Sequence, residues 1–338
     1  MQEVDVIVIG SGIASLKALH VANELGKKVI AIDSTYVDGG YVQVIDKEVL
    51  LPKAPFFVHE EDVDFFYSLG IEFKCLDVEV FILKNGNYIT KTLGYSNIDV
   101  QKNWFYEWIN RRKLCLHRNL FSALKKSLGY TETLPIHITS SIRRIDLANR
   151  IVALTSGEII KYEKLVYTWP LPLLPKLLVP ETIKNNVAQM LNNLDLQYVS
   201  SYILTVVLPK NKQNKIKIHI HSTKASRMHT AISISTGEHR VLYAITSYTK
   251  NYSLLPGIYE KLISELRRFK ILSLKDIIKG YGLNITYALI NKVKSKHIEE
   301  LKQKLEEYNV YLYGRLGLWR EQIIKEIIQD KKLEKTLS

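Results

Sequence analysis

The sequence contains very little cysteine. Only Cys75 and Cys115 occur among its 338 residues, and their spacing is not that of metal ligands. Two cysteines are too few for a disulfide framework, so we expect both to be reduced thiols, although distant cysteines can also meet through folding. The sequence therefore excludes a cysteine-stapled scaffold and predicts no metal centre.

Long apolar runs are missing as well. No stretch reaches the roughly 20 consecutive apolar residues that a membrane-spanning helix requires. The first residues enter an expected core strand directly, which leaves no room for a signal or transit peptide. A hydrophobic content of 46% with 24% charged residues is typical of a globular protein. We expect a cytoplasmic protein without a transmembrane segment.

Acidic residues are too few to balance the basic ones. The formal net charge is +13 and the isoelectric point is about 9.4. Such a charge favours an anionic partner: nucleic acid, a membrane surface, or a phosphorylated or carboxylated small molecule. The basic residues are spread along the chain, and the densest run, residues 210–217, is interpreted as a solvated turn. Nucleic acid thus remains an open but not favoured partner, and nothing indicates an oligomeric state.

The most informative segment is the N-terminus. Residues 4–9 read as a buried parallel strand and are followed by Gly10-Ser11-Gly12-Ile13-Ala14-Ser15. A long amphipathic stretch then leads to a second apolar strand, residues 28–33, which ends in Asp33. A strand, a glycine turn, a helix and an acid about twenty residues beyond the glycines form the pattern of a dinucleotide-binding unit.

Each residue type in this pattern has a physical role. Gly10 permits the tight turn out of the strand, and Gly12 lets the backbone approach a pyrophosphate because no Cβ is in the way. The following helix directs its free N–H groups and its positive dipole end at the phosphates. Asp33 is placed to accept hydrogen bonds from a ribose hydroxyl. Ser15 replaces the third glycine of the usual motif. The alternative to dinucleotide binding is that this strand–glycine–helix unit only serves packing.

The rest of the chain alternates strands and helices. A second strand, glycine turn and helix start occurs at residues 309–318, so another anion-binding geometry lies near the C-terminus. A meander with strands at 138–145, 151–154 and 158–161 leads to a further strand, 165–168. We expect short strands at 41–45 and 48–51, a hairpin at 78–90, four or five strands within 199–248, and helices at 60–70, 101–111, 119–128, 258–268, 294–307 and 318–332.

Three separated blocks together resemble the FAD-dependent amine oxidase superfamily, in particular protoporphyrinogen-oxidase-like and UDP-galactopyranose-mutase-like flavoproteins. The blocks are the N-terminal motif with Asp33 and Gly39-Gly40, the segment Lys164 to Leu171, and the segment Tyr311 to Trp319. The resemblance implies an α/β protein with a discontinuous Rossmann-like FAD-binding domain and a second, β-rich α+β substrate domain. It assigns residues 1–60, 118–170 and 285–338 to the first, and 61–117 and 171–284 to the second.

By the same resemblance, FAD is the expected cofactor, and backbone or side-chain groups of seventeen residues would contact it. These are Gly10, Gly12, Ile13, Ala14, Ser15, Asp33, Ser34, Gly39, Gly40, Tyr41, Ile142, Thr168, Gly314, Arg315, Gly317, Leu318 and Trp319.

Some of these positions carry alternatives or depart from the family. Arg315 stands between turn glycines and would approach the pyrophosphate, or it could pair with a carboxylate of the protein. Trp319 would pack near the cofactor, or it could be an ordinary tryptophan of a helix. Tyr41 stands where much of the family has an arginine. The histidine-bearing glycine loop expected of a galactopyranose mutase is not evident.

The sequence contains few indications of a substrate-binding site, and it identifies no catalytic residue. Family geometry suggests Tyr41, Lys53, Arg227, His229 and Tyr287 as candidates near the flavin. Arg227 and His229 alternate and would share one face of a strand, which could form a small cationic pocket for an anionic substrate. The alternatives are a surface lysine at position 53 and an edge strand with solvated polar residues at 227–229. Two further histidines, His219 and His221, also alternate but lack a supporting carboxylate or cysteine for a metal.

Three functions fit these observations. The first is an FAD-dependent oxidoreductase of the amine-oxidase type that removes a hydride from a small molecule, for which an anionic substrate would suit the charge. The second is a flavoenzyme without net redox chemistry, such as a sugar-nucleotide ring mutase. The third is a catalytically inactive flavin-fold protein that binds nucleic acid or protein through its basic surface.

Overall fold

The computed structural model describes residues 2–34, 40–42, 44, 49, 51–82, 98–130, 137–210, 214–221, 226–236, 238–251 and 253–338. The chain forms two compact units, each assembled from separate segments. Unit 1 comprises residues 1–40, 121–196 and 292–338, and unit 2 comprises residues 41–120 and 197–291. Residues 41–60 therefore lie in unit 2 and residues 171–196 in unit 1, the reverse of the domain assignment expected from the sequence.

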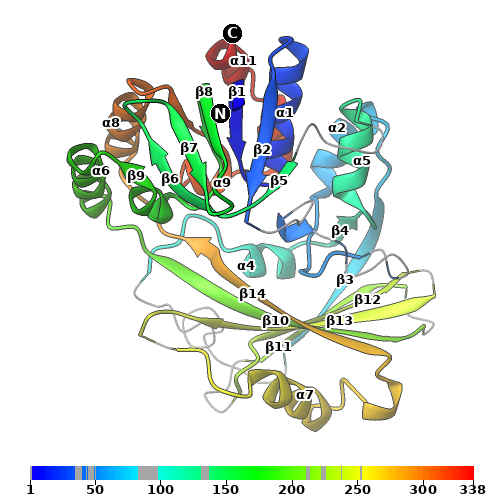
Figure 1. Ribbon diagram of the computed structural model, residues 1–338. Helices are drawn as coiled ribbons and strands as arrows, with labels where there is room; N and C mark the ends of the chain where they lie inside the picture. Colours follow the sequence, from blue (N-terminus) through cyan, green and yellow to red (C-terminus); the bar gives the residue numbers. More distant parts are fainter. Residues whose placement is uncertain are drawn as a thin grey trace. The chain divides into compact units, whose positions relative to one another are not determined.

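Unit 1 is built on a largely parallel sheet (Figure 1). Strand β1 (Gln2–Ile9) lies between β2 (Val29–Asp33) and β8 (Ile159–Tyr167) and is parallel to both. The edges are extended by β5 (His137–Thr139), beside β2, and by β7 (Ile151–Leu154), β6 (Ile142–Asp146) and β9 (Leu178–Val179), beyond β8. The short strand β15 (Val310–Leu312) pairs in parallel with the last residues of β8.

The order of these strands places a topological switch point at β1. The chain leaves β1 towards β2 on one side, while β8 lies on the other side of β1. Where neighbouring strands connect in opposite directions, their carboxyl ends open a crevice that typically binds nucleotides. Helix α1 (Ile13–Glu24) begins at this point, with three residues between it and the end of β1. The expected strand–helix–strand unit is therefore present.

Helix α1 is held by apolar packing rather than by side-chain capping. Its residues Ala18, Leu19 and Ala22 are 0–1% exposed and pack against Val6 and Val8 of β1. The apolar strands are buried on both faces, which is characteristic of a parallel sheet covered by helices. The remaining helices of unit 1 are α5 (Leu120–Ser127), α6 (Glu181–Asn193), α8 (Ser295–Glu306), α9 (Gly314–Gly317), α10 (Ile324–Gln329) and α11 (Lys332–Leu337), with the 3-10 turn η3 (Leu171–Lys176).

Unit 2 contains a mostly antiparallel sheet in the order β14-β10-β13-β12-β11-β3-β4 (Figure 1). Its strands are β3 (Lys74–Ile82), β4 (Lys113–Leu116), β10 (Tyr198–Pro209), β11 (Ile216–Ile220), β12 (Thr230–Thr236), β13 (His239–Tyr248) and β14 (Lys279–Ile290). The helical elements are α2 (Val63–Ser68), α4 (Trp104–Ile109) and α7 (Ile258–Arg268), with the 3-10 turns η2 (Glu60–Asp62) and η4 (Leu274–Asp276); a third, η1 (Gly40–Val42), lies at the boundary of the units.

Both faces of this second sheet are buried. One face packs against Phe105 and Trp108 of α4, and the other packs against Leu262 and Leu266 of α7. The strands alternate between the two clusters: on β13, Tyr243 belongs to the first and Leu242 and Ala244 belong to the second. This is the two-residue period of a strand, here with apolar side chains on both sides.

The two cysteines are not free thiols, which corrects the expectation from the sequence. Cys75 of β3 and Cys115 of β4 are directly opposite in the antiparallel pair and form a disulfide. They are 40 residues apart in the chain, so only the register of these strands brings them together. The backbone of Cys115 also pairs with Val58, and the disulfide therefore sits between two backbone ladders.

Several local expectations also need correction. The segments 158–161 and 165–168 were expected as separate strands, but one strand, β8, covers both because each half pairs with a different edge neighbour, β7 or β15. The expected final helix over 318–332 does not form as one element: α9 ends at Gly317, and the helices after it are α10, from Ile324, and α11, from Lys332. Gly40–Val42 forms a 3-10 turn where a strand was expected to begin. The tip of the expected 78–90 hairpin lies outside the described residues.

Candidate functional site

The first turn of the dinucleotide motif is packed too tightly for any side chain at Gly10. Its φ is +127°, and a Cβ there would lie 2.2 Å from Oγ1 of Thr168 and 2.7 Å from Oγ of Ser15. Oγ1 of Thr168 donates to the carbonyl of Ile9 at 2.7 Å. Because that bond uses its only proton, Ser15 donates to Thr168 at 2.8 Å. Ser15 thus joins α1 to the end of β8, where the family's third glycine only permits close packing.

Gly12, in contrast, faces open space. A Cβ built on Gly12 meets no atom within 4 Å, and the residue is partly exposed. It is the N-cap of α1, where neither a side-chain cap nor an acidic residue of the first turn satisfies the leading N–H groups. Gly40, with φ +54°, approaches from the other side, since its added Cβ would lie 3.7 Å from the Cα of Gly12. This is a backbone cradle that a side chain would fill.

The C-terminal block converges on the same helix start. Gly314 has φ +74°, and a Cβ there would lie 2.4 Å from the Cβ of Ala14, in the first turn of α1. Gly317 packs equally closely on β8, where an added Cβ would lie 2.4 Å from the carbonyl oxygen of Tyr167. Two stretches of chain separated by about three hundred residues therefore meet at the N-terminus of α1.

Asp33 lies at the carboxyl end of β2, as expected, and is 8% exposed. Its Oδ2 accepts a hydrogen bond from Oγ of Ser11 at 2.8 Å and a longer one from Nε1 of Trp169 at 3.4 Å. The carboxylate is thus oriented by the glycine turn itself, while its neighbour Ser34 is exposed. A carboxylate accepts about four hydrogen bonds, so these contacts are compatible with a ribose hydroxyl, and that role stays a prediction.

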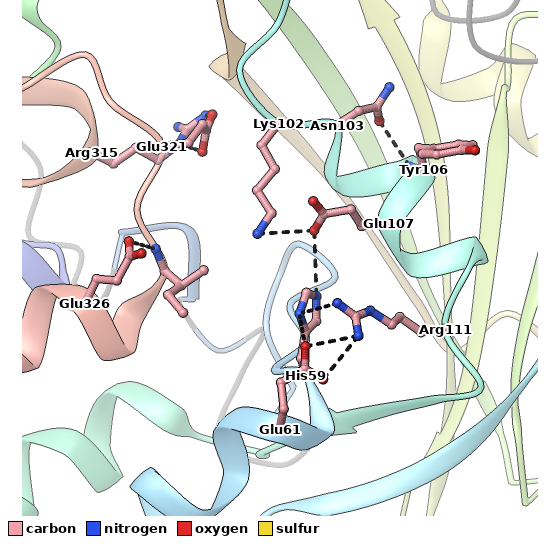
Figure 2. Close-up of polar contacts among 11 residues, drawn as sticks. His59, Glu61, Lys102, Asn103, Tyr106, Glu107, Arg111, Arg315, Glu321 and Glu326 are labelled. Atoms are coloured by element: carbon pink, nitrogen blue, oxygen red, sulfur yellow. Dashed lines mark hydrogen bonds and ion pairs between the residues drawn. The ribbon is translucent and has the colours of Figure 1, made fainter. Parts of the chain in front are cut away.

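Arg315 pairs with a carboxylate of the protein, which was the alternative to a pyrophosphate contact in the sequence analysis. Its Nε and Nη2 donate to the two carboxylate oxygens of Glu321 at 2.8 and 2.7 Å (Figure 2). The arginine side chain is 16% exposed and that of Glu321 only 6%. A bidentate pair of this kind fixes the segment after Gly314 and offsets the arginine charge. A further contact with a pyrophosphate remains a prediction.

The other predicted cofactor residues of unit 1 differ in exposure. Trp319 is 1% exposed with φ +47°, which is rare for a bulky residue, so its side chain belongs to the core. Ile142 is 7% exposed on β6, two residues after Ser140, whose N–H donates to the carbonyl of Asp33. Ile13, Ala14, Thr168 and Leu318 are partly exposed. Gly39 and the side chain of Tyr41 lie outside the described residues.

The structure does not support the cationic pocket expected from Arg227 and His229. Neither residue is in a strand, because β12 begins at Thr230. Arg227 is exposed, whereas His229 is 0% exposed with its ring against Phe105. Burial lowers the pKa of His229 to about 3, so the imidazole is neutral at physiological pH. This expectation was wrong because a chain bend, rather than a strand, separates the two residues.

Instead, His229 belongs to a buried polar chain. Its Nδ1 contacts Oγ1 of Thr230 at 2.8 Å, and its Nε2 contacts Oγ of Ser247 at 2.9 Å. Ser247 in turn contacts Oγ of Ser201 on β10 at 3.0 Å. The hydroxyl groups give both ring nitrogens of His229 a hydrogen-bond partner without a charged group. This series of hydrogen bonds therefore cross-links three segments of the sheet.

The remaining substrate candidates are structural contacts of unit 2. Lys53 is half-buried, and its carbonyl accepts from Oγ1 of Thr205 at 2.7 Å. Tyr287 is 9% exposed, with its ring 4.6 Å from that of Tyr198. The described residues contain no group of three or more histidine, cysteine or acidic side chains arranged to hold a metal.

Unit 2 contains a charged cluster that the sequence did not predict. His59 lies between two glutamates, with its Nδ1 3.7 Å from Glu61 and its Nε2 3.7 Å from Glu107 (Figure 2). Arg111 contacts both Nδ1 of His59, at 3.2 Å, and Glu61, at 3.0 Å. Lys102 pairs with Glu107 at 3.3 Å. These residues come from two distant chain segments, 59–61 and 102–111, so no spacing in the sequence indicated them.

The geometry fixes which nitrogen of His59 carries the proton. A guanidinium can only donate, so the Arg111 contact makes Nδ1 the acceptor. Burial, and then the charge of Arg111, lower the pKa of His59, which keeps the ring neutral. The single ring proton therefore lies on Nε2 and faces Glu107. The side chain of His59 is 10% exposed and that of Glu107 is 29% exposed, but Oε2 of Glu107, the oxygen that faces the ring, is itself buried.

Comparisons with known proteins give a fold but no sequence relative. No protein-family profile matches the chain, and no curated protein matches its sequence. Among solved structures, a reduced UDP-galactopyranose mutase is similar over 99% of this chain and 94% of its own, with a TM-score of 0.75 and 12% identity. A fatty acid isomerase from P. acnes that produces CLA matches over 98% and 97%, with a TM-score of 0.67 and 11% identity.

A third similar structure is a putrescine oxidase variant with redesigned cofactor binding. It covers 83% of this chain and 84% of its own, with a TM-score of 0.54 and 11% identity. This chain shares the fold of these three proteins. In the part of the chain that the structure describes, no helix is long and apolar enough to cross a membrane.

Proposed function

We propose that unit 1 binds FAD and that the chain is an FAD-dependent enzyme acting on a small molecule. The observation that carries the proposal is the open cradle at Gly12, with the glycines of the C-terminal block packed against the first turn of the same helix. The fold is that of proteins whose cofactor is FAD. A pyrophosphate fits this cradle because uncapped N–H groups and the positive end of α1 would face it.

Different residues of unit 1 would bind different parts of the cofactor. Backbone N–H groups at the start of α1 would bind the diphosphate, and Asp33 would accept from the adenosine ribose. The Arg315–Glu321 pair would hold the C-terminal block in place beside Ala14. When bound, FAD supplies hydride transfer or covalent catalysis at its ring, while the protein supplies position and electrostatics.

Of the two flavin chemistries, we place isomerisation without net electron transfer ahead of substrate oxidation. The mutase and the isomerase resemble this chain over 98–99% of its length, whereas the oxidase resembles 83% of it. The missing glycine loop with a histidine argues against sugar-nucleotide mutation itself. Turnover that requires prior reduction of the flavin but consumes no electron acceptor would distinguish isomerisation from oxidation.

On the substrate side, we propose the pair His59 and Glu107 as the groups that move a proton. Support comes from the neutral imidazole, its fixed tautomer and the partly exposed carboxylate beside Nε2. Arg111 is a positioning residue, because it holds Nδ1 as an acceptor. Lys102 lies 3.3 Å from Oε2 of Glu107 and holds this carboxyl group in place.

The test of cofactor binding is the visible spectrum of two purified variants. Gly12→Asp places a carboxylate in the cradle, where it should repel the pyrophosphate by charge and by volume. Gly26→Asp adds the same charge in unit 1, at another glycine whose Cβ would meet no atom within 4 Å. We expect wild type and Gly26→Asp to carry FAD in near-stoichiometric amount, and Gly12→Asp to lose at least nine-tenths of it.

Two outcomes would contradict the proposal. Full FAD content in folded Gly12→Asp would show that the cradle does not hold the diphosphate. A colourless wild type that takes up no FAD, combined with a salt-dependent gel shift of nucleic acid, would instead support the third function, a binding protein built on a flavin fold.

A further inference from the structure

Unit 2 contains an open, strongly basic hollow of about 1000 Å³. It lies at the C-terminal end of α7 and is bordered by the turn η4 and the beginning of β13. Its charged lining comprises Arg240, Arg267, Arg268, Lys270 and Lys275 against a single acid, Asp276. Two hydroxyls, from Ser264 and Ser273, complete the polar lining. We call this set of residues the basic hollow.

The protein offsets the cations of the basic hollow only in part: Asp276 attracts Arg240, and the guanidinium of Arg268 lies 4.7 Å from the ring centre of Phe269. Within the described ranges, none of the five forms an ion pair within 4 Å. Elsewhere in unit 2, surface lysines pair readily, as Lys113 with Glu60 and Lys215 with Glu79 show. The Nε of Arg240 is buried and has no hydrogen-bond acceptor among the residues that the structure describes. A buried, unpaired guanidinium N–H is costly, and burial also lowers the pKa of Arg240, so an anion beside the accessible part of this guanidinium would stabilise its charge.

Ordinary helix electrostatics explains only part of this arrangement. Arg267 and Arg268 occupy the last turn of α7, where cations favour the helix dipole. Arg240, however, comes from β13, and Lys275 comes from η4. Cations from three separate elements are thus gathered at one hollow, which dipole stabilisation of one helix does not require.

Lys270 lies at the edge of the hollow in a left-handed backbone conformation. It has φ +57° and follows the C-cap of α7, where its N–H donates to Arg267 and the next N–H donates to Leu266. Helices usually place glycine at this left-handed position, because any Cβ there costs up to about 1 kcal/mol. The chain accepts local strain and keeps a lysine at the edge of the hollow.

We propose that the basic hollow binds a compact ligand with two or three adjacent phosphate groups. Five cations against one acid match a ligand with three or four negative charges. The planar forks of three arginines suit phosphate oxygens, and the two serine hydroxyls are further donors. This site lies wholly within unit 2 and is separate from the diphosphate cradle at Gly12 in unit 1, so it does not depend on FAD binding.

The alternatives for the basic hollow are larger anionic partners. Leu274 and Ile278 are 48% and 49% exposed near the rim, which is a short apolar edge for a membrane. No aromatic side chain lines the hollow, whereas single-stranded nucleic acid is typically held on aromatic platforms. A concave, hydroxyl-containing lining favours the compact phosphate ligand.

The test is calorimetric titration of the FAD-loaded protein with inorganic triphosphate at low salt. Arg267→Ala removes one exposed cation. Lys270→Gly removes a second exposed cation and relieves the strain of the left-handed backbone. The melting temperature of this variant should therefore be no lower than that of wild type. Lys261→Ala, on an exposed position of α7 outside the hollow, is the matched control. We expect one site, about tenfold weaker binding in each of the first two variants, and less than a twofold change in the control.

Three results would overturn the proposal. The first is the absence of saturable binding of triphosphate to wild type. The second is an equal loss of affinity in Lys261→Ala, which would indicate attraction by net charge alone. The third is tight binding of phosphatidylglycerol vesicles or duplex DNA that depends on Arg267 and Lys270 while triphosphate does not bind. The FAD spectrum is recorded for every variant, so loss of the cofactor is recognised separately.

Discussion

At the scale of single residues, the glycines of the cradle differ in why a side chain is excluded. Gly12 has an ordinary φ of −84° and is required only if a ligand approaches. Gly10 and Gly314 have positive φ and also lack space for a Cβ. The sequence motif identified all three, but only the structure separates the glycine that faces open space from those that face the protein.

Gly314→Ala tests the convergence of the two backbone stretches. Its Cβ would overlap that of Ala14 at 2.4 Å and would also sit at φ +74°. Gly26→Ala has nearly the same φ, +69°, but open space around its Cβ. We expect Gly26→Ala to cost about 1 kcal/mol of unfolding free energy and Gly314→Ala about 1–3 kcal/mol more, because only the second adds overpacking.

Urea denaturation of the two variants measures this difference. Equal losses of stability would show that Gly314 does not contact the first turn of α1. The same comparison made with FAD bound shows whether the displaced segment also contributes to cofactor affinity.

His229 should make the protein sensitive to acid. Its pKa is about 3 in the folded chain and about 6.5 when unfolded, so the unfolded state takes up a proton first as the pH falls. Stability is therefore lost below about pH 6.5, at up to about 1.4 kcal/mol per pH unit. Between pH 7 and pH 5 this one residue should remove about 2 kcal/mol of unfolding free energy.

Chemical denaturation of His229→Gln at the two pH values checks this. The variant should be less stable than wild type at pH 7, because the Ser247 contact is lost, but its loss between pH 7 and pH 5 should be smaller by about 2 kcal/mol. His297→Gln on α8 removes a histidine outside this buried chain and should keep the slope of wild type. An unchanged slope in His229→Gln would contradict the argument.

At the scale of elements, the end of the chain shows where periodicity misleads. The apolar pattern from Leu318 onward predicts one helix, but the chain bends at Trp319, whose side chain enters the core. Glu321 then turns back to pair with Arg315, and α10 starts afresh with the carboxylate of Glu326 accepting the N–H of Ile323 at 3.1 Å (Figure 2). Burying a large ring and a bidentate ion pair outweighs the propensity of a few helical residues.

The pair of strands β3 and β4 carries the disulfide, and its removal should be measurable. Cross-linking positions 40 residues apart restricts the unfolded chain, so the double variant Cys75→Ala with Cys115→Ala should lose about 2–4 kcal/mol of unfolding free energy. A reductant should destabilise wild type by a similar amount and leave the double variant unchanged. Two titratable thiols in native, unreduced wild type would contradict the pairing.

At the scale of the whole molecule, the architecture is two units that each use the chain discontinuously. Unit 1 needs β1 and α1 from the N-terminus, β8 from the middle, and β15 and α9 from the C-terminus to complete one cradle. Unit 2 combines β3 and β4 with the later strands β10–β14 in one sheet. A resemblance in three short blocks was enough to indicate this class of fold, because the blocks are the parts of unit 1 that meet.

The sequence by itself determined the dinucleotide unit, because strand, glycine turn, helix and acid are consecutive and each follows from local sterics and periodicity. It also determined the likeness of the C-terminal block to a second glycine turn. Only the tertiary structure decided the disulfide, the His59 cluster, the Arg315–Glu321 pair and the basic hollow. The members of the disulfide, the His59 cluster and the basic hollow are brought together by strand register and loop paths over tens of residues, and the six-residue Arg315–Glu321 contact depends on the bend at Trp319. Such contacts leave no spacing in the sequence from which they can be inferred.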